Sequence, residues 1–508
     1  MLTLADVFEA LTGVRPDRAD PMVPIGDGDE YIGVGYNGVH RGTSGTSRII
    51  TEACIDSRQA IPGALFVALP GQRVDGHDYV GEAFKRGADF ALVQKDLGEQ
   101  FPVIDLRAGV MTMMPMDTSG TATFSLPAEG PFVLRVEDSL KALQQVARFW
   151  RRKLDVRVIG ITGSVGKSTT KELIAEVLSQ RYHTLKNVGN LNNEIGLPLT
   201  LLSLGEGHER AVLEMGFYAA GEIAFLCDLS LPHVGVVTNI GTVHAERAGS
   251  IEEIARGKAE LVQSLPPDGV AVLNYDDPLV RDMAGLTHAK VLFYGMNPEA
   301  DLWADEVEGL GLDGIRFRLH YQGEVLHLRV PLIGRHSVQT ALRAAAVGLV
   351  EGLNWQEIVS GLRSGTTQLR LMAVRTENGA LILDDTYNAS PDSTLAALNL
   401  LHELDGRKIA VLGDMLELGQ YEWQGHEMVG IRAAEVVDML ITIGERGRMV
   451  AAAACRAGLP AAVITEFEDS QQAIEILRQQ LQAGDVVLVK GSHGMRMDEI
   501  VSALEFRR

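Results

Sequence analysis

The chain has 508 residues and a formal net charge of −21, from 67 acidic and 46 basic residues. Such an excess of acid excludes nucleic acid as a partner, because binding a phosphate backbone requires a basic surface. No run approaches 18 uninterrupted apolar residues, so we expect no transmembrane helix. The length is too great for one hydrophobic core and predicts about three domains.

The N-terminal segment predicts a folded amphipathic helix rather than a secretory leader. Residues 1–9 lack a basic segment and carry acids within their apolar pattern. The three cysteines, Cys54, Cys227 and Cys455, are scattered and form no C-x-x-C pair. We therefore expect a reduced, cytoplasmic protein.

Residues 1–152 predict an N-terminal α+β domain. Its expected elements after the first helix are strands at 64–69 and 90–93 and helices at 80–86 and 139–152. Two segments, near 21–47 and 109–131, are rich in Gly, Thr, Ser and Pro, which predicts loop or hairpin insertions.

Residues 153–364 predict a central domain with a mainly parallel sheet, because apolar strands alternate with helical patterns. The expected elements are strands at 156–161, 211–214, 234–239 and 270–273, antiparallel strands at 315–321 and 325–330, and a closing helix at 336–350. Residues 365–508 repeat the alternation with strands at 381–385, 408–412, 439–443 and 485–490. This second unit predicts a small, doubly wound, Rossmann-like domain and places the chain in the α/β class.

A glycine-rich segment after the first strand of the central domain is the most informative part of the chain. Residues 160–168 follow the pattern G-x-x-G-x-x-G-K-S, and a helical pattern continues directly from them. Small residues let backbone N–H groups close on phosphate oxygens, and the helix N-terminus favours negative charge. Lys167 would reach the terminal phosphates and the Ser168 hydroxyl would bind Mg²⁺. Although Ile161 stands where the strict pattern has glycine, the context predicts ATP or GTP binding rather than a turn without a ligand.

Three residues further along the chain suggest metal chemistry. Glu214 ends one predicted strand and His244 follows another, so both belong to the sheet edge where ligands bind. A carboxylate beside a phosphate loop is a natural second anchor for Mg²⁺. The alternatives are a capping or surface acid for Glu214 and an ordinary loop histidine for His244. Lys258 could bind a metal only as a carbamate formed with CO₂, because an ammonium repels cations, and the residues alone favour a plain helix lysine.

These motifs resemble those of the Mur ligase family. The resemblance is carried by the phosphate loop and by residues 190–198, 214–216, 238–244 and 257–260, and it covers nearly the whole chain apart from the two insertions. It implies a UDP-substrate domain at 1–152, an ATPase domain at 153–364 and a Rossmann-like ligase domain at 365–508. It also implies that Lys258 is carbamylated and that Ser168, Glu214, His244 and Lys258 hold Mg²⁺, of which two ions are expected.

The resemblance further implies two sets of binding residues. Those expected to bind ATP are Thr162, Gly163, Ser164, Val165, Gly166, Lys167, Ser168, Thr169, Asn274, His336, Arg370 and Asp385. Those expected to bind the other substrates are Ser57, Arg58, Gln72, Arg73, Asp75, Gly76, His77, Asn190, Asn192, Asn193, Tyr387, Asn388 and Ser390. Serine and arginine suit a diphosphate, although a structural Asp–Arg pair at a turn is the alternative for any one of the early residues.

Residues 384–393 and 411–419 resemble the family members that add D-Ala-D-Ala to UDP-MurNAc-tripeptide, and the Asp-Asn-Pro-Arg tetrapeptide of the diaminopimelate-adding ligase is absent. The implied reaction is ATP-driven amide ligation through an acyl phosphate, in cytoplasmic peptidoglycan precursor synthesis, with Lys167, Glu214, His244 and Lys258 as catalytic residues. The family also implies a monomer. The alternatives are a sister ligase with another amino acid and a non-catalytic nucleotide-binding protein.

The chain departs from the family pattern at three positions. Ser337 and Thr340 stand where the family usually has asparagines, and His493 stands where it usually has arginine. Thr340 puts the usual adenine contact in question.

Overall fold

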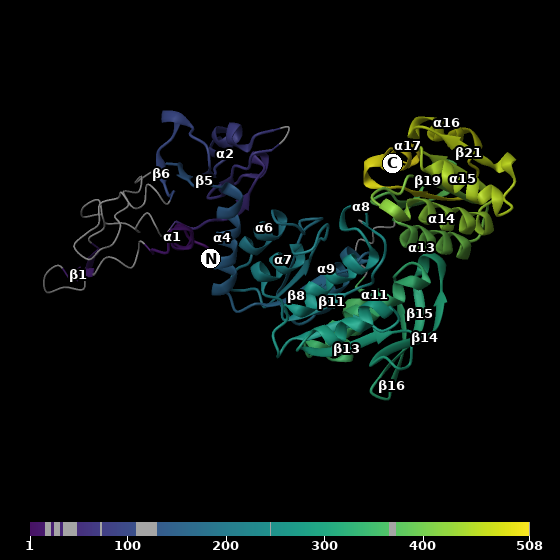
Figure 1. The fold of residues 1–508 in the computed structure, drawn as a ribbon, viewed down its shortest axis with the longest axis horizontal. Coiled ribbons are helices and arrows are strands. Elements are labelled where there is room, and N and C mark those ends of the chain that lie inside the picture. Colours follow the sequence, from purple (N-terminus) through teal and green to yellow (C-terminus); the bar gives the residue numbers. More distant parts are fainter. Residues whose placement is uncertain are drawn as a thin grey trace. The chain divides into compact units, whose positions relative to one another are not determined.

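The computed structural model describes residues 1–15, 22–24, 31–33, 48–71, 74–107, 130–243, 245–364 and 372–506 (Figure 1). The chain forms two compact units. The first contains Met1–Arg157, Asn187–Glu209 and Asp228–Leu231, and the second contains Val158–Lys186, Arg210–Cys227 and Pro232–Arg508. The predicted boundary near 152 thus falls close to the end of the first long segment, whereas the boundary near 364 lies inside the second unit and stays a prediction. Across the described ranges, every helix is too short or too polar to cross a membrane.

The first unit is built on a five-stranded sheet. The strands are β3 (Ala53–Cys54), β4 (Leu65–Val67), β5 (Phe90–Val93), β6 (Val103–Asp105) and β7 (Phe132–Arg135), in the order β3-β4-β5-β7-β6. All four pairings are parallel, so the unit is α/β and more regular than the predicted α+β arrangement. The strands are almost wholly apolar because both faces of the sheet are covered.

Among its described residues, the helices of this unit are α1 (Leu4–Thr12), α2 (Val80–Lys85), α4 (Ser139–Lys153) and α6 (Gly196–Leu202). Within the first predicted insertion, β1 (Met22–Pro24) and β2 (Tyr31–Gly33) pair antiparallel. Most of the second insertion lies outside the described residues. The guanidinium of Arg151, at the end of α4, donates to the carbonyls of Leu154, Val156 and Ser230 at 2.7–3.0 Å. This buried arginine therefore attaches residues 228–231 to the first unit.

The second unit contains a nine-stranded sheet in the order β16-β15-β14-β13-β12-β11-β8-β10-β9. Its strands are β8 (Arg157–Thr162), β9 (Thr184–Lys186), β10 (Arg210–Glu214), β11 (Val234–Val237), β12 (Val270–Asn274), β13 (Lys290–Gly295), β14 (Leu302–Gly309), β15 (Ile315–Tyr321) and β16 (Glu324–Val330). Strands β8, β11, β12, β13 and β14 pair in parallel, and β14, β15 and β16 pair antiparallel. The predicted parallel core with an antiparallel end is confirmed.

Helices cover both faces of this sheet because successive strand residues point to opposite sides. The helices are α5 (Lys167–Leu178), α7 (Glu222–Ser230), α8 (Ala245–Ala248), α9 (Ile251–Gln263), α10 (Pro278–Arg281), α11 (Val338–Val350) and α12 (Trp355–Arg363). On one face, Val236 and Val272 pack with α5, α11 and α12. On the other face, Val237 and Leu273 pack with α9.

A six-stranded sheet in the order β17-β18-β22-β19-β20-β21 completes the second unit. Its strands are β17 (Met372–Arg375), β18 (Leu381–Asp385), β19 (Lys408–Gly413), β20 (Met439–Ile443), β21 (Ile464–Phe467) and β22 (Val486–Lys490), and its helices are α13 (Pro391–Glu403), α14 (Glu422–Val436), α15 (Gly447–Arg456), α16 (Ser470–Gln480) and α17 (Asp498–Leu504). All pairings except β17–β18 are parallel. Figure 1 shows α13 and α14 on one side of this sheet and α16 and α17 on the other, as predicted for a doubly wound domain.

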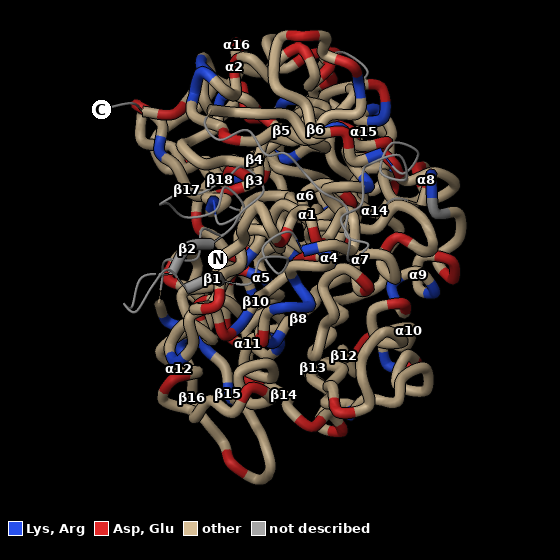
Figure 2. Tube along the Cα trace, turned by 90° about the vertical axis from the view of Figure 1, so that its left-hand side faces the viewer, with Lys and Arg blue, Asp and Glu red and all other residues tan. Residues whose placement is uncertain are grey.

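The acidic residues are spread over the elements of the chain, with Lys and Arg interspersed among them (Figure 2). A site for anionic ligands in this protein therefore depends on a few locally placed cations rather than on its overall charge.

Candidate active site

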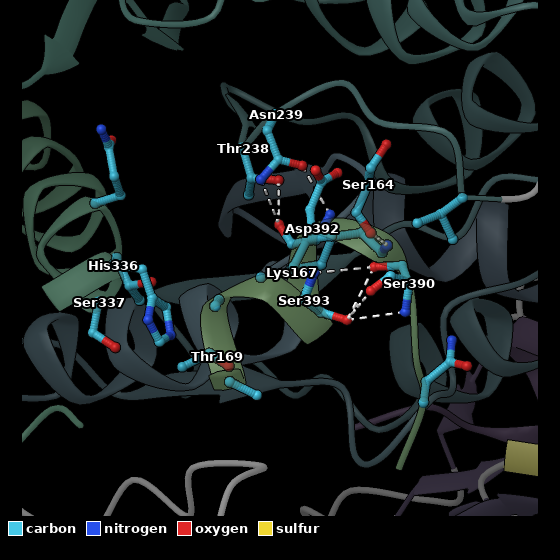
Figure 3. Close-up of a pocket in the computed structure, with 18 of the residues that line it drawn as sticks. Ser164, Lys167, Thr169, Thr238, Asn239, His336, Ser337, Ser390, Asp392 and Ser393 are labelled. Atoms are coloured by element: carbon cyan, nitrogen blue, oxygen red, sulfur yellow. Dashed lines mark hydrogen bonds between the residues drawn. The ribbon is translucent and has the colours of Figure 1, made fainter. Parts of the chain in front are cut away.

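The phosphate-loop motif forms the turn between β8 and α5, and the end of β11 holds it in place. The backbone N–H of Val165 donates to Asn239 Oδ1 at 2.9 Å, while Thr238 Oγ1 and Asn239 Nδ2 donate to the Val165 carbonyl at 2.7 and 3.2 Å (Figure 3). A Cβ at Gly163, where φ is +141°, would lie 1.9 Å from Thr238 Oγ1. Glycine is required at this position because the loop packs directly against the strand end.

Lys167 and Ser168 are the first residues of α5, as the sequence pattern predicted. The Lys167 ammonium donates to the carbonyls of Gly163 and Ser164 at 2.9 and 3.3 Å, so it lies folded against its own loop. Ser168 Oγ donates to Glu214 Oε2 at 2.5 Å. Glu214 ends β10 and is 2% exposed. A hydroxyl and a carboxylate oxygen therefore meet beside the phosphate loop, and these are ligand atoms that suit Mg²⁺.

Lys258 lies on α9 and is 1% exposed, which the sequence did not predict. Its ammonium lies 4.6 Å from the centre of the Phe217 ring, and among the described residues no carboxylate forms an ion pair with it. A Cβ on the neighbouring Gly257 would lie 2.1 Å from Phe217, so glycine makes room for the ring. Burial, with the nearby charge of Lys167, holds the pKa of Lys258 well below its ordinary value.

The second unit encloses a cavity of about 340 Å³ next to the phosphate loop. Its wall combines loop residues with residues that precede or begin α11 and α13. Figure 3 shows His336 and Ser337 across the cavity from Ser390, with Lys167 and Asp392 between them. The predicted residues that line it are Ser164, Val165, Gly166, Lys167, Thr169, Asn274, His336, Asp385, Asn388 and Ser390.

The other predicted residues of this region have different places. Thr162 is buried and donates to the Met215 carbonyl at 3.3 Å, so it joins β8 to the end of β10. Gly163 accepts a hydrogen bond from Lys167, which lines the cavity, whereas Ser168 donates to Glu214, which does not line it. His244 and Arg370 lie outside the described residues, and so do Gln72 and Arg73. Within the described part of the chain, no group of three or more His, Cys, Asp and Glu side chains could hold a metal ion.

The C-terminal part of the cavity wall is organised by a buried ion pair. Lys490, 2% exposed at the end of β22, donates to Asp385 Oδ2 at 2.6 Å and to the Asn388 carbonyl at 2.9 Å. Ser390 caps α13 in a capping box with Ser393. The segment that carries Asp385, Asn388 and Ser390 is thus fixed at both ends.

Two further residues of the cavity wall, Asn274 and His336, are affected by their neighbours in different ways. Asn274 Nδ2 donates to the Thr238 carbonyl at 3.1 Å, and its Oδ1 accepts from the backbone of Asp276. Removal from bulk water in the cavity, with the charges of Arg343 and Lys490, lowers the pKa of His336 to about 4. At neutral pH its imidazole is therefore uncharged and can both donate and accept a hydrogen bond.

The departures from the family pattern also lie in this region. Ser337 and Thr340 line the cavity, and Ser337 Oγ donates to the Ile333 carbonyl at 2.7 Å. His493 lies near Tyr387, with ring centres 6.1 Å apart. Tyr387 itself is 41% exposed and is absent from the cavity wall.

The predicted UDP residues belong to the first unit. Asp56 caps the 3₁₀ helix Ser57–Gln59, and its carboxylate accepts two hydrogen bonds from the guanidinium of Arg58, at 2.9 and 2.7 Å. This pairing lowers the pKa of Asp56 to about 2. Ser57 is buried, whereas the Arg58 side chain is 78% exposed. The structural Asp–Arg pair that the sequence left as an alternative is present, and the exposed arginine can still contact a ligand.

Asp75, Gly76 and His77 form a second structured turn. His77 Nε2 accepts from the backbone N–H of Gln94 at 3.1 Å, so the other ring nitrogen, Nδ1, donates to Asp75 Oδ1 at 2.6 Å. Asp75 also pairs with Lys95, and these bonds hold the pKa of its carboxyl well below the ordinary range. His77 is buried, and its ring links this turn to the backbone of Gln94.

The asparagine segment lies in the same unit. Asn193 Oδ1 accepts from the backbone of Ile195 and Gly196 at 3.3 and 2.9 Å, so Asn193 positions the start of α6. Asn190 is exposed, and its carbonyl accepts from the backbone of Asn192 at 2.7 Å.

Sequence reasoning did not assign several residues that line the cavity. These are Thr238, Asn239, Gln339, Arg343, Asp392, Ser393 and Lys490. Thr238 and Asn239 belong to a motif that carries the family resemblance, so that motif was the available signal for them. Arg343 has no comparable signal because it lies in an alanine-rich helix as a single charged residue.

The phosphate loop and the cavity beside it are those of a nucleotide-binding protein. The chain belongs to the Mur ligase family. Residues 49–151 match the Mur ligase family catalytic domain, residues 161–348 match the Mur ligase middle domain, and residues 369–493 match the Mur ligase glutamate ligase domain.

Within the family, the chain is similar to enzymes named UDP-N-acetylmuramoyl-tripeptide–D-alanyl-D-alanine ligase. It is 34% identical to that of Bacillus subtilis, over 90% of this chain and 93% of the relative, and 35% identical to that of Synechocystis, over 90% and 92%. Among solved structures, MurF from Acinetobacter baumannii matches with a TM-score of 0.73 and 30% identity, over 89% of this chain and 93% of that one. MurF ligase from Thermotoga maritima in complex with ADP matches with a TM-score of 0.73 and 26% identity, over 89% and 96%.

Proposed function

We propose that the chain is an ATP-dependent ligase that joins D-Ala-D-Ala to UDP-MurNAc-tripeptide in peptidoglycan precursor synthesis. The observation that carries this proposal is the composition of one cavity wall, in which phosphate-loop residues stand together with Asp385, Asn388 and Ser390 of the ligase segment. Relatives that carry this activity in their names align with about nine-tenths of the chain, which supports it further. A cytoplasmic location and a monomeric state remain predictions.

In the proposed reaction, the γ-phosphoryl group of ATP passes to the terminal carboxylate of the tripeptide and gives ADP and an acyl phosphate. The amine of D-Ala-D-Ala attacks this activated carbonyl, phosphate leaves from the tetrahedral intermediate, and an amide bond forms. The activation matters because a carboxylate is a poor electrophile at neutral pH. Lys167 acts by leaving the carbonyls of Gly163 and Ser164 and donating to the transferred phosphoryl group, whose charge it stabilises.

The residues that would hold Mg²⁺ are Ser168 and Glu214, with His244 and the carbamate of Lys258. The contact between Ser168 Oγ and Glu214 Oε2 at 2.5 Å supports this assignment, because both oxygens suit a hard cation. When bound, Mg²⁺ would neutralise charge on the phosphates.

The surroundings of Lys258 support its carbamylation. Only the uncharged amine attacks CO₂, and burial with a depressed pKa raises the fraction of that form. In this step the nitrogen of the uncharged amine bonds to the carbon of CO₂ and loses a proton, so a neutral group becomes an anion with two oxygens. A plain surface lysine would lack both the burial and the shifted pKa.

Substrate binding is proposed for two groups of residues. Tyr387, Asn388 and Ser390 would contact the peptide end of the reaction, and Arg370 would reach the ATP phosphates. In the first unit, Ser57, Arg58, Gln72, Arg73, Asp75, Gly76, His77, Asn190, Asn192 and Asn193 would bind the UDP-sugar. The exposed guanidinium of Arg58 is the member of this group whose chemistry best suits a diphosphate.

Phosphate release tests the proposed function. The purified chain with ATP and Mg²⁺ should release phosphate only when both UDP-MurNAc-tripeptide and D-Ala-D-Ala are present, and mass spectrometry should find the pentapeptide product. Lys167→Ala should remove this release. Release that continues without either substrate would overturn the proposal. Parallel reactions with tripeptides ending in lysine or diaminopimelate identify the third residue.

A further inference from the structure

Arg343 is a buried arginine in the cavity wall whose guanidinium is only partly hydrogen-bonded. It lies on α11 and is 5% exposed. Its Nε donates to the Gln339 carbonyl at 2.9 Å, and its Nη2 donates to Thr340 Oγ1 at 3.2 Å. The third nitrogen, Nη1, is buried and has no hydrogen-bond partner in the described part of the chain. Thr340, which accepts from Arg343, is one of the positions that depart from the family pattern.

The free nitrogen of Arg343 lies against the phosphate loop. A Cβ built on Gly166 would be 3.3 Å from Nη1 and 3.6 Å from Nη2. Gly166 is the residue immediately before α5, whose N-terminal N–H groups favour anions. Both residues line the same cavity. The unused donor is therefore next to the part of the loop that is built for phosphate.

The charge of Arg343 is not balanced by a side chain. Among the described residues, no carboxylate forms an ion pair with it, and its nearest aromatic contact is Tyr294, with 5.8 Å from Cζ to the ring centre. Burial lowers the pKa of Arg343, but a guanidinium stays protonated in proteins. A buried cation without an anion is costly, and an anionic ligand removes most of that cost. A neutral base or ribose would accept a hydrogen bond and leave the charge unbalanced.

We propose that Arg343 is a nucleotide-phosphate-binding residue, which donates a hydrogen bond from Nη1 to a phosphate oxygen of the ligand in this cavity. The proposal rests on the proposed function in one respect, that ATP is the ligand of the cavity. It adds a second cation to Lys167 from a different element, α11. A planar guanidinium suits this role because it directs several N–H groups toward phosphate oxygens.

Direct titration of nucleotides tests the proposal. Binding of ATP, ADP, AMP and adenosine to the full chain is measured by calorimetry, without the other substrates, for the wild type and for Arg343→Met. The variant should bind ATP and ADP about tenfold to a hundredfold more weakly, as expected for the loss of a hydrogen bond to a charged group, and adenosine with unchanged affinity. Arg363→Met, at an exposed arginine on α12, is the matched control and should change no affinity.

Thermal unfolding separates ligand binding from a structural role. Because the substitution removes an unbalanced buried charge, the Tm of Arg343→Met without nucleotide should equal or exceed that of the wild type, while the increase in Tm caused by ADP should shrink. A lower Tm with an undiminished ADP effect would overturn the proposal. Equal losses for adenosine and ATP, or no loss for either, would also overturn it. If the wild type binds no nucleotide, the proposed function itself fails. This result differs from failure of the Arg343 proposal alone, in which the wild type binds nucleotide and the variant binds it equally well.

Discussion

In the described part of the chain, buried charge is paired with opposite charge at Asp6 of the first unit and is left without a carboxylate partner at Lys258 and Arg343 of the second unit. In the first unit, Asp6 is 5% exposed and accepts hydrogen bonds from Arg15 and Lys153 at 2.7 and 2.8 Å. In the second unit, Lys258 and Arg343 are buried at 1% and 5% exposure, and among the described residues neither forms an ion pair with a carboxylate.

The comparison distinguishes charged side chains that stabilise the fold from charged side chains that are available to bind a ligand. A paired charge loses its partner when the chain unfolds, so it contributes to stability. A buried cation without a partner costs stability, and its retention indicates a function that uses the charge or the shifted pKa. A substitution at Asp6 should therefore act on stability, and substitutions at Lys258 and Arg343 should act on activity and binding.

The largest effect is expected for Lys258→Ala. Ligase activity should fall about a thousandfold or more, because the anionic carbamate that would position Mg²⁺ is lost. Small carboxylic acids added at high concentration should restore part of the rate, since they supply the missing oxygens. Lys153→Ala, which removes a paired lysine of the first unit, is the control and should lower the Tm while keeping kcat. A wild-type rate for Lys258→Ala would refute the carbamate.

An intermediate effect is expected for Asp6→Asn. Burial alone would raise the pKa of Asp6, but hydrogen bonds from Lys153, Thr3 and Arg15 lower it from 3.8 to about 2. The carboxylate should contribute about 2 kcal/mol to the stability of the first unit. Because folding lowers this pKa, the contribution is complete above about pH 4 and is lost as the pH falls toward 2. Urea unfolding of both proteins at a series of pH values measures it, and a difference that grows on acidification would contradict the assignment.

The smallest effect on stability is expected for Arg58→Ala. The pair with Asp56 is largely exposed, so its loss should leave the Tm unchanged within error. If Arg58 contacts the diphosphate, KM for the UDP substrate should rise about tenfold, as for one lost charged hydrogen bond, with kcat unchanged. A lower Tm with an unaltered KM would assign Arg58 to the fold alone. This variant tests whether a charged side chain of the first unit binds a ligand instead of stabilising the fold.

Much of the fold was predictable because its elements are local. The strands at β8, β10, β11 and β12 are short apolar runs, and the loop before Lys167 has a glycine pattern with a direct steric cause. By contrast, β9 and β14 were missed: β9 is only three residues long and half-buried, and the apolar start of β14 is followed by three acidic residues, Asp305, Glu306 and Glu308. Propensity is weak in such segments, and pairing with neighbouring strands decides their conformation.

Residues of the candidate site that belong to a sequence motif could be predicted. Residues whose place depends on burial or on contacts distant in the chain could not. Lys490 meets Asp385 across 105 positions of the chain, and no local pattern signals that contact. Likewise, Lys258 reads as an ordinary helix lysine until the structure places Phe217 over it. The role of Lys258 stays a prediction of the family resemblance, and the structure adds the burial and the lowered pKa that support it.

The bracing of the phosphate loop by Thr238 and Asn239 has a kinetic consequence. Since these side chains fix the Val165 peptide, the backbone amides are already arranged before any nucleotide arrives, and little chain entropy is lost on capture. The part that must move is Lys167, whose ammonium first has to leave two loop carbonyls. Contact between Lys167 and a phosphate therefore requires the rotation of one side chain rather than a rearrangement of the loop backbone.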